Sequence, residues 1–285
     1  MPLRRVTGVR IATWNVNSIR SRIDRLEAWL QRSDVDVLAI QETKAREDQF
    51  PHDRVRALGY EVAHHGLNQW NGVAVLSRVG IEDVTVGFEG DPGWGDPVAP
   101  EARAIGATCG GVRMWSLYVP NGRGLDDPHM DYKLAWLDAL RAQAAGWAAD
   151  GAQVALCGDW NIAPQDEDVW SMEYYQDKSH VSPGERAAFQ AVLDAGYTDL
   201  VRPHAPGPEV YTYWDYQQLA FPKRRGMRID FVLGSASFAE RVSGAAIDRE
   251  ERKGKGASDH APVIVGLDGD DGAAVDKPVE GSPAR

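Results

Sequence analysis

The sequence predicts an α/β protein built from layers of sheet and helix. Residues 9–16, VRIATWNV, have the composition of a strand, and residues 18–33 place their apolar side chains on one helical face. Residues 35–42, VDVLAIQE, then form a nearly continuous apolar run, which indicates a buried strand. A strand, a helix and another strand in succession are typical of a layered α/β fold.

The same kinds of element continue along the chain. Residues 72–78 are expected to form a strand, and residues 102–120 two strands joined by a turn at Gly110 and Gly111. A second helix is expected at about 131–149. The elements expected after it are a strand at 152–161, a helix at 183–196, a strand at 227–235 and a last strand within 258–267. Because the motif GDWN resembles the TWN that ends the first strand, the pattern hints at an internal duplication.

The composition indicates one well-packed globular domain. The chain has 285 residues, is 43% hydrophobic and contains 10 Trp and 9 Tyr residues, which is enough to build a sizeable core. We assign residues 1–267 to a single domain and residues 268–285, rich in Gly, Ala, Pro and Asp, to a disordered acidic tail. The two cysteines, Cys109 and Cys157, are expected to be buried free thiols.

Charge and the absence of targeting signals narrow the functional class. No segment has the length of a membrane span and the N-terminal residues lack an apolar signal region, so we expect a cytoplasmic protein. The formal net charge of -11 argues against a nucleic-acid partner. The tail, however, supplies five acids against two bases, and metal-binding carboxylates also count as negative charge. The basic segments 221–228 and 249–256 are either solvated loops or local contact surfaces.

Polar side chains stand at strand ends where apolar ones would pack better. They are Asn15, Glu42, Asp159, Asn161, Asp230, Asp259 and His260. Any one of them alone would be interpreted as a turn or capping residue. Several carboxylates at neighbouring strand ends, by contrast, need a cation or a shared proton, because burying an unpaired charge is costly.

The types of these side chains indicate which cation they would bind. Glu, Asp and Asn are hard oxygen donors, which suit Mg²⁺, or Mn²⁺ in its place, better than Zn²⁺. Mg²⁺ held by a few carboxylates is the usual arrangement for phosphoryl and phosphodiester chemistry. The sequence therefore predicts a metal-dependent site that handles a phosphate.

Eight short motifs follow one another along the chain: TWNVNSIR, QETK, WNGVAVLSR, YVPNG, GDWNIAP, YTYWDY, RIDFVL and SDHAPV. Their order and spacing resemble the exonuclease III family of apurinic/apyrimidinic endonucleases, within the endonuclease/exonuclease/phosphatase superfamily. The resemblance runs from about residue 9 to residue 267. It is specific within the superfamily, because SIR, QETK and YTYWDY go beyond the shared metal core.

The resemblance implies a four-layered α/β sandwich, in which two facing mixed β-sheets are flanked by helices and the site lies where the strand ends meet. It implies a Mg²⁺-dependent phosphodiesterase that cleaves the bond 5′ to abasic sites in duplex DNA during base excision repair. It also implies 3′–5′ exonuclease activity and 3′-phosphatase or phosphodiesterase activity on blocked 3′ ends. Nothing in the sequence demands more than a monomer.

The resemblance also assigns roles to the residues that hold the metal and the water. It implies that Glu42 is the principal Mg²⁺ ligand, with Asn15 and Asp259 in support. Asp159 is expected to orient or deprotonate the attacking water, with Asn161 beside it.

The remaining catalytic roles concern the phosphate. The resemblance implies that His260 contacts the scissile phosphate and is held by Asp230, which would fix its tautomer and favour its protonated form. Tyr118 would add a phosphate contact. The identity of the general base stays open, because a carboxylate near Mg²⁺ has a lowered pKa, a His paired with Asp is already a cation, and Mg²⁺ lowers the pKa of its own water. We favour Asp159.

An aromatic and basic segment precedes Asp230. Such a cluster is either core packing or a surface that stacks on a flipped nucleotide. The resemblance implies that Tyr213, Met227 and Ile229 line an apolar pocket for an abasic deoxyribose, with Trp214 in the same substrate-binding segment, and that Arg228 lies on DNA. Since relatives often carry another apolar residue at the position of Met227, we expect this position to set the tightness of the pocket.

Further positions resemble the DNA-facing loops of the family. They are Lys44, Asn71, Asn121 and Arg123. Asn17 stands where some relatives carry Asp, which removes one carboxylate near the metal ligands. Because the protein is so acidic, its affinity for DNA is expected to be modest and to fall steeply with salt.

Two other functions compete with this hypothesis. A sphingomyelinase, an inositol-polyphosphate phosphatase or a DNase I-like hydrolase would share the metal core, since one fold hosts many activities. The motif YTYWDY before RIDF weighs against these enzymes. A catalytically inactive DNA-binding scaffold is expected to have lost one or more site residues, and none is missing.

Overall fold

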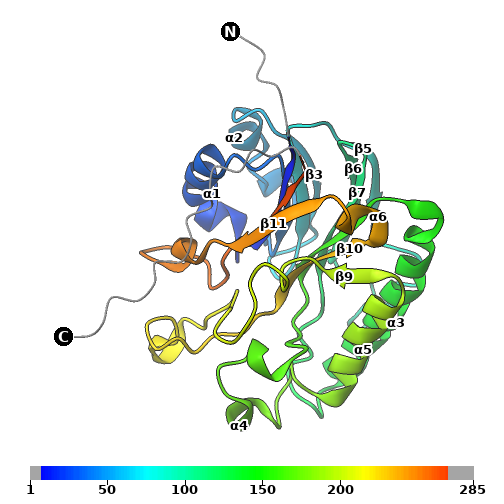
Figure 1. The fold of residues 1–285 in the computed structure, drawn as a ribbon, viewed down its shortest axis with the longest axis vertical. Coiled ribbons are helices and arrows are strands. Elements are labelled where there is room, and N and C mark those ends of the chain that lie inside the picture. Colours follow the sequence, from blue (N-terminus) through cyan, green and yellow to red (C-terminus); the bar gives the residue numbers. More distant parts are fainter. Residues whose placement is uncertain (1–7, 269–285) are drawn as a thin grey trace.

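The computed structural model describes residues 8–268 and contains two six-stranded β-sheets that pack face to face (Figure 1). The first sheet has the order β11–β12–β1–β2–β4–β3, and the second has the order β5–β6–β7–β8–β10–β9. The strands of the first sheet are β1 (Arg10–Asn15), β2 (Val37–Gln41), β3 (Glu61–His65), β4 (Val73–Ser77), β11 (Val242–Ile247) and β12 (Val263–Leu267). Those of the second are β5 (Glu82–Val86), β6 (Ala104–Cys109), β7 (Val112–Tyr118), β8 (Val154–Asp159), β9 (Tyr197–Asp199) and β10 (Asp230–Ser235).

Helices cover the outer faces of both sheets. The α-helices are α1 (Ile19–Ser33), α2 (His52–Arg56), α3 (Pro128–Trp147), α4 (Met172–Tyr175), α5 (Pro183–Asp194) and α6 (Ala236–Ala239). The short 3-10 helices are η1 (Glu47–Gln49), η2 (Ala149–Gly151), η3 (Asp166–Asp168), η4 (Gln217–Leu219) and η5 (Arg249–Arg252). Figure 1 shows α1 and α2 on one side of the sheets and α3 with α5 on the opposite side. The predicted four-layered α/β sandwich is confirmed.

Three apolar clusters hold the layers together. The inner cluster lies between the sheets and includes Ile11, Val75 and Cys157. A second joins the apolar face of α1 to the first sheet, and a third joins α3 and α5 to the second sheet through side chains such as Trp136 and Phe231. Each large apolar side chain buried in this way contributes about 1.5–3 kcal/mol to stability.

The two sheets repeat one arrangement. Strands β1 and β2 pair in parallel in the middle of the first sheet, and β7 and β8 pair in parallel in the middle of the second. The other pairings of the two sheets are antiparallel, so both sheets are mixed. This correspondence agrees with the hint of duplication in the TWN and GDWN strand ends.

Two elements begin three residues away from the start that the sequence predicts. The helix expected at about 131–149 begins at Pro128, because the Asp127 side chain accepts a hydrogen bond from the backbone N–H of His129 and caps the helix. The strand expected at 227–235 begins only at Asp230. Met227 instead forms isolated bridges with Val169 and Tyr213, so the chain there crosses the end of the sheet.

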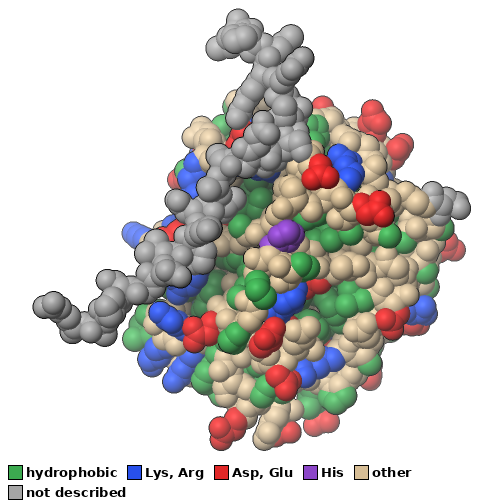
Figure 2. All heavy atoms as spheres, in the orientation of Figure 1, with side chains coloured by type: hydrophobic (Ala, Val, Ile, Leu, Met, Phe, Trp, Pro, Cys, Tyr) green, Lys and Arg blue, Asp and Glu red, His purple; other side chains and the backbone are tan. Residues whose placement is uncertain are grey.

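Other expectations concern the surface and the termini. Both cysteines are free and buried, as predicted. Within residues 8–268, none of the helices combines the length and the apolar character that a membrane span needs. The predicted tail lies outside the described residues, apart from Asp268. On the face drawn in Figure 2, Lys and Arg side chains are interspersed with Asp and Glu side chains rather than gathered in one basic field.

Candidate active site

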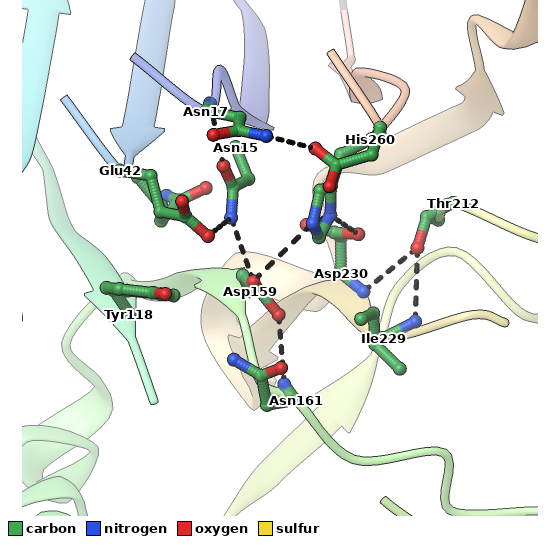
Figure 3. A network of polar contacts seen from close by, with 12 residues as sticks. Asn15, Asn17, Glu42, Tyr118, Asp159, Asn161, Thr212, Ile229, Asp230 and His260 are labelled. Carbon is green, nitrogen blue, oxygen red and sulfur yellow. Dashed lines mark hydrogen bonds and ion pairs between the residues drawn. The ribbon is translucent and has the colours of Figure 1, made fainter. Parts of the chain in front are cut away.

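The strand ends of both sheets bring the predicted catalytic residues together (Figure 3). Asn15 ends β1, and Glu42 directly follows β2, its parallel neighbour. Asp159 ends β8, where it lies opposite Tyr118 of β7 in parallel register and opposite Asp230 of β10 in antiparallel register. Because parallel strands present their carboxyl ends at the same edge, the facing sheets place these side chains in one cluster.

Asn15 links the two carboxylates at the centre of this cluster. Its Nδ2 donates to Glu42 Oε1 at 2.9 Å and to Asp159 Oδ2 at 2.9 Å. Its Oδ1 accepts from the backbone N–H of Asn17 at 3.0 Å. In the metal-free structure the amide nitrogen therefore faces the carboxylates and separates them.

Lys44 compensates the charge of Glu42. Its Nζ lies 2.7 Å from Glu42 Oε2 and donates to Asn17 Oδ1 at 2.7 Å. Burial acts to raise the pKa of Glu42, but the Lys44 ammonium and the hydrogen bonds from Lys44 and Asn15 outweigh it and hold the pKa below its usual value. Lys44, predicted to face DNA, thus pairs with the predicted metal ligand. Asn17 Nδ2 in turn donates to Asp259 Oδ1 at 3.0 Å, so Asp259 lies at the edge of the cluster.

The donor set fits a divalent cation. Glu42 and Asp159 each offer one carboxylate oxygen, and these oxygen atoms lie within 4.8 Å of each other and of a ring nitrogen of His260. Glu42 already attracts a positive group, the Lys44 ammonium. One fully buried and one half-buried carboxylate, beside a displaceable ammonium, offer hard oxygen atoms that suit Mg²⁺ or Mn²⁺.

Asp230 holds His260 as a cation. His260 Nδ1 lies 2.8 Å from Asp230 Oδ2 and 3.1 Å from Oδ1, while Thr212 Oγ1 accepts hydrogen bonds from the backbone N–H groups of Ile229 and Asp230. Burial acts to lower the pKa of His260, but the charges of Asp230 and Asp159 raise it to about 10. The imidazolium Nε2 then lies 3.8 Å from Asp159 Oδ2, facing the space between the carboxylates.

In the metal-free site the pKa of Asp159 is raised. Burial raises its pKa to about 7; the carboxylates of Asp230 and Glu42 act in the same direction, and His260 opposes them. The backbone N–H of Asn161 donates to Asp159 Oδ1 at 3.0 Å and fixes the orientation of the carboxylate. A buried carboxylate held in this way has the properties of a general base.

A buried polar network that sequence reasoning missed supports Asn161. Asn161 has a left-handed backbone, with φ of 50°, and its Oδ1 accepts from Asn121 Nδ2 at 3.0 Å and lies 3.2 Å from His180 Nε2. Lys133 Nζ donates to the Asn161 carbonyl at 2.7 Å and pairs with the buried Glu185. The capping box that Glu185 forms with its helix is visible in the sequence, but its ion pair with a lysine on another helix is not.

Tyr118 keeps its hydroxyl proton. Burial and the nearby Glu42 carboxylate raise the pKa of its phenol well above the usual range. The Arg103 guanidinium packs 4.8 Å from the ring centroid and fixes the ring. Tyr118 can therefore act as a hydrogen-bond donor at the edge of the cluster (Figure 3).

A pocket next to the catalytic cluster collects several predicted substrate-binding residues. Asn121, Arg123, Tyr213 and Met227 line it, together with His180. The Tyr213 ring lies 4.9 Å from the His260 ring, so the pocket adjoins the catalytic histidine. Ile229, predicted to line the same pocket, is 2% exposed and packs behind it with Met227 in a small apolar cluster.

The structure corrects three predicted substrate contacts, which concern buried side chains. Trp214 is 1% exposed and packs in an interior aromatic cluster with Tyr211, while Arg228 is 2% exposed. Asn71 is fully buried, and its Nδ2 donates to Glu101 Oε1. The reason is local: in an extended segment successive side chains point to opposite sides. Because Tyr213 and Met227 face the pocket, their neighbours Trp214 and Arg228 face the interior.

Arg228 has an interior role in place of the predicted DNA contact. Its Nε donates to Asp168 Oδ1 at 2.7 Å and its Nη1 to Asp199 Oδ2 at 2.7 Å. Asp168 is fully buried and also pairs with Arg202. These residues form a buried ion network behind the pocket, which joins the segment of Met227 to β9.

Comparison with known proteins places this geometry among nucleases. The model of the Endonuclease/Exonuclease/phosphatase family matches residues 12–260. The DNA repair nuclease APEX1 of Danio rerio is 31% identical over 274 residues, which cover 92% of this chain and 83% of that protein. A 3′-5′ exonuclease from Neisseria meningitidis, NExo, which is also described as a 3′ phosphatase, is 36% identical with a TM-score of 0.86, covering 91% of this chain and 100% of that one. An AP endonuclease from Archaeoglobus fulgidus is 33% identical with a TM-score of 0.85, covering 91% and 99%.

Proposed function

The chain belongs to the endonuclease/exonuclease/phosphatase family, and on that premise we propose that it is a DNA repair hydrolase acting on abasic sites and on 3′ ends. It would cleave the phosphodiester 5′ to an abasic site in duplex DNA and remove 3′ phosphates, other blocking groups and nucleotides. The observation that carries the proposal is the convergence of Glu42, Asp159 and His260, with ligand atoms within 4.8 Å of one another, where the strand ends of two sheets meet. The DNA repair nuclease, exonuclease and AP endonuclease to which the chain is similar support the choice of substrate.

The carboxylates would hold a Mg²⁺ ion, and Mn²⁺ could take its place. Glu42 is the principal ligand in this proposal, and Asp159 offers a second oxygen to the same space. When bound, such an ion supplies positive charge to the phosphate oxygens during hydrolysis. Asn15 and Asp259 remain proposed as supporting ligands; in the metal-free structure Asn15 Nδ2 donates to both carboxylates, and Asp259 Oδ1 accepts from Asn17.

The protein side chains would carry the proton transfer and stabilise the charge. Asp159 accepts the proton of the attacking water, with its orientation held by Asn161. His260, kept protonated by Asp230, donates from Nε2 to a phosphate oxygen and stabilises the negative charge that develops there. Tyr118, whose hydroxyl stays protonated, donates a further hydrogen bond to the phosphate.

The pocket beside His260 would recognise the sugar. Tyr213 and Met227 present an aromatic ring and a flexible thioether, which suit the apolar face of a deoxyribose without a base. Asn121 and Arg123 line the same pocket and would contact the flanking phosphates. In this proposal the substrate is duplex DNA with an abasic site or a blocked 3′ end.

The residues of the proposed site converge within one chain, so the site needs no second copy to be complete. The two cysteines are free and buried, which is in keeping with the reducing environment of the cytoplasm. We therefore extend the proposal to a cytoplasmic monomer.

The proposal is tested with labelled duplexes that differ at one nucleotide. One carries a tetrahydrofuran abasic analogue, one a 3′ phosphate beside a nick, and one an intact base, each incubated with Mg²⁺ or with EDTA. We expect metal-dependent cleavage of the first two and none of the intact duplex at its centre. The Asp159→Asn variant is the matched control for contaminating nucleases and should be inactive on both substrates.

The same assay separates the alternatives. Release of phosphate from the 3′ end without incision would restrict the protein to end processing. Activity on neither duplex, together with hydrolysis of a sphingomyelin or an inositol polyphosphate, would refute DNA repair as its function. DNA binding with no hydrolysis under Mg²⁺ or Mn²⁺ would indicate a catalytically inactive scaffold.

A further inference from the structure

A second group of metal-ligating side chains lies outside the proposed active site. Glu47, His52 and His64 each offer one ligand atom, and these atoms lie within 4.8 Å of one another. Glu47 begins η1, His52 begins α2, and His64 lies in the edge strand β3. Three consecutive elements thus converge on one point, and the proposed hydrolysis uses none of these side chains.

The three ligand groups are already arranged around a common centre. Glu47 Oε1 lies 2.8 Å from His52 Nε2, and Glu47 Oε2 lies 2.8 Å from His64 Nδ1. Phe50 packs against both imidazoles, with ring centroids 4.9 Å from His52 and 4.4 Å from His64. The His64 side chain is fully buried, whereas that of Glu47 is 67% exposed. An ion could therefore enter from solvent beside Glu47 and meet two nitrogen ligands fixed on an apolar wall.

In the metal-free structure the two ring nitrogens that face the centre, His52 Nε2 and His64 Nδ1, both donate to the Glu47 carboxylate, and an ion would take the place of these protons. Thr43 Oγ1 lies 3.0 Å from His64 Nε2 and can accept a hydrogen bond from it, so Thr43 would stabilise the tautomer that leaves a lone pair on Nδ1 when an ion takes the place of the Nδ1 proton. Burial lowers the pKa of His64, although Glu47 opposes this effect, and the lower pKa favours the neutral ring that a metal ligand needs. His52 Nδ1 is buried and has no hydrogen-bond partner among the described residues, so it can carry the ring proton when Nε2 binds an ion.

We propose that Glu47, His52 and His64 bind a divalent transition-metal ion, with Zn²⁺ the best match. Two imidazoles and one carboxylate are a ligand set that Zn²⁺ favours, in contrast to the hard oxygen atoms around Glu42. Glu47 supplies one negative charge toward the two positive charges of the ion, and the solvent side supplies water for the remaining position.

The ion would brace the turn that carries the active-site ligand. His64 contacts Thr43, the residue after Glu42, and the backbone N–H of Thr43 donates to the Gly72 carbonyl at 3.0 Å. Glu42 and Lys44 both have left-handed backbones, with φ of 53° and 48°. Non-glycine residues keep such conformations only when the surrounding structure holds them. An ion that fixes the His64 ring would therefore strengthen the support of this turn.

The experiment measures Zn²⁺ binding by calorimetry and Co²⁺ binding by its visible absorption, with excess Mg²⁺ present to occupy the active site. The wild type, the active-site variant Asp159→Asn and the exposed-histidine control His204→Gln should each bind one Zn²⁺ at this site. His52→Gln and Glu47→Gln should each weaken that binding by at least about tenfold and abolish the Co²⁺ absorption. Because Glu47 is exposed, its variant keeps the test valid if His52→Gln does not fold.

Separate outcomes test whether the metal site exists and whether a bound ion stabilises the turn at Thr43. Absence of Zn²⁺ and Co²⁺ binding in the wild type, or binding that both His52→Gln and Glu47→Gln retain, overturns the site. For the brace, Zn²⁺ should slow hydrogen exchange of the Thr43 amide in the wild type and not in Glu47→Gln, while the Leu233 amide in the other sheet stays unchanged. Bound Zn²⁺ without slower exchange at Thr43 overturns the bracing role.

Discussion

Replacement of Arg228 distinguishes an interior ion network from a DNA contact. In the Arg228→Met variant, Asp168 and Asp199 each lose a hydrogen bond of 2.7 Å. Asp168 is fully buried, and breaking a buried pair on one side costs about 3–5 kcal/mol. Arg202 still contacts Asp168, and the Asp199 side chain is 15% exposed, so we expect a loss at the lower end, about 3 kcal/mol.

Urea and thermal unfolding measure this loss. For a domain of this size a destabilisation of about 3 kcal/mol lowers Tm by about 6–12 °C. The matched control is Arg224→Met in the same basic segment, where the side chain is 69% exposed and pairs with Glu209 at 3.3 Å. An exposed pair of this kind contributes less than about 1 kcal/mol, so the control should keep its Tm.

Measurement of DNA binding tests the alternative, in which Arg228 contacts DNA. If Arg228→Met left Tm unchanged, and instead weakened DNA binding and reduced the slope of log K against log salt by about 1, Arg228 would be a phosphate contact. The interior assignment, and with it the argument from alternating side chains, would then be wrong.

Three further predictions concern the catalytic cluster. Asp159→Asn or His260→Ala should lower kcat on the abasic duplex by about 10²–10⁴ without weakening DNA binding, and full activity of Asp159→Asn at saturating Mg²⁺ would contradict its role as base. Glu42→Ala should cause a smaller loss that excess Mg²⁺ relieves; a loss independent of Mg²⁺ concentration would remove Glu42 from the metal site. The pKa of His260, raised from 6.5 to about 10, contributes stability that is fully present below pH 6.5 and is lost as pH rises to about 10. The free energy of unfolding without metal should therefore fall between these pH values, and Asp230→Asn should weaken that fall.

The sequence predicts the catalytic cluster well because its residues break a pattern. Polar side chains at the ends of apolar strands are conspicuous, and the topology then brings those ends together. Asp159 and Asp230 illustrate this point: each follows or begins an apolar run, and the antiparallel register of β8 and β10 places them opposite each other. The ligand types identify the chemistry before any distance is known.

The direction of individual side chains was not predictable in the same way. Arg228 lies in a basic segment that suits DNA, yet its partner Asp168 is 60 residues away, and no local signal links the two. Trp214 directly follows Tyr213 in the chain, yet the Trp214 side chain lies in the interior and the Tyr213 side chain lines the pocket. Glu47, His52 and His64 are separated by a helix and a loop, so only the folded chain shows that they converge.

Lys44 shows how a site can be both stable without metal and open to it. Glu42 and Lys44 are two residues apart, and their left-handed backbones turn both side chains toward each other, which the sequence does not reveal. Without the ammonium, Glu42 and Asp159 would be two nearby buried carboxylates with only the His260 cation to balance them, an arrangement with a high electrostatic cost. With the Lys44 ammonium present, metal binding replaces one cation beside Glu42 by another. The affinity for Mg²⁺ therefore depends on how much more strongly Glu42 interacts with Mg²⁺ than with the Lys44 ammonium. Replacing Lys44 with Met should tighten Mg²⁺ binding and destabilise the metal-free protein.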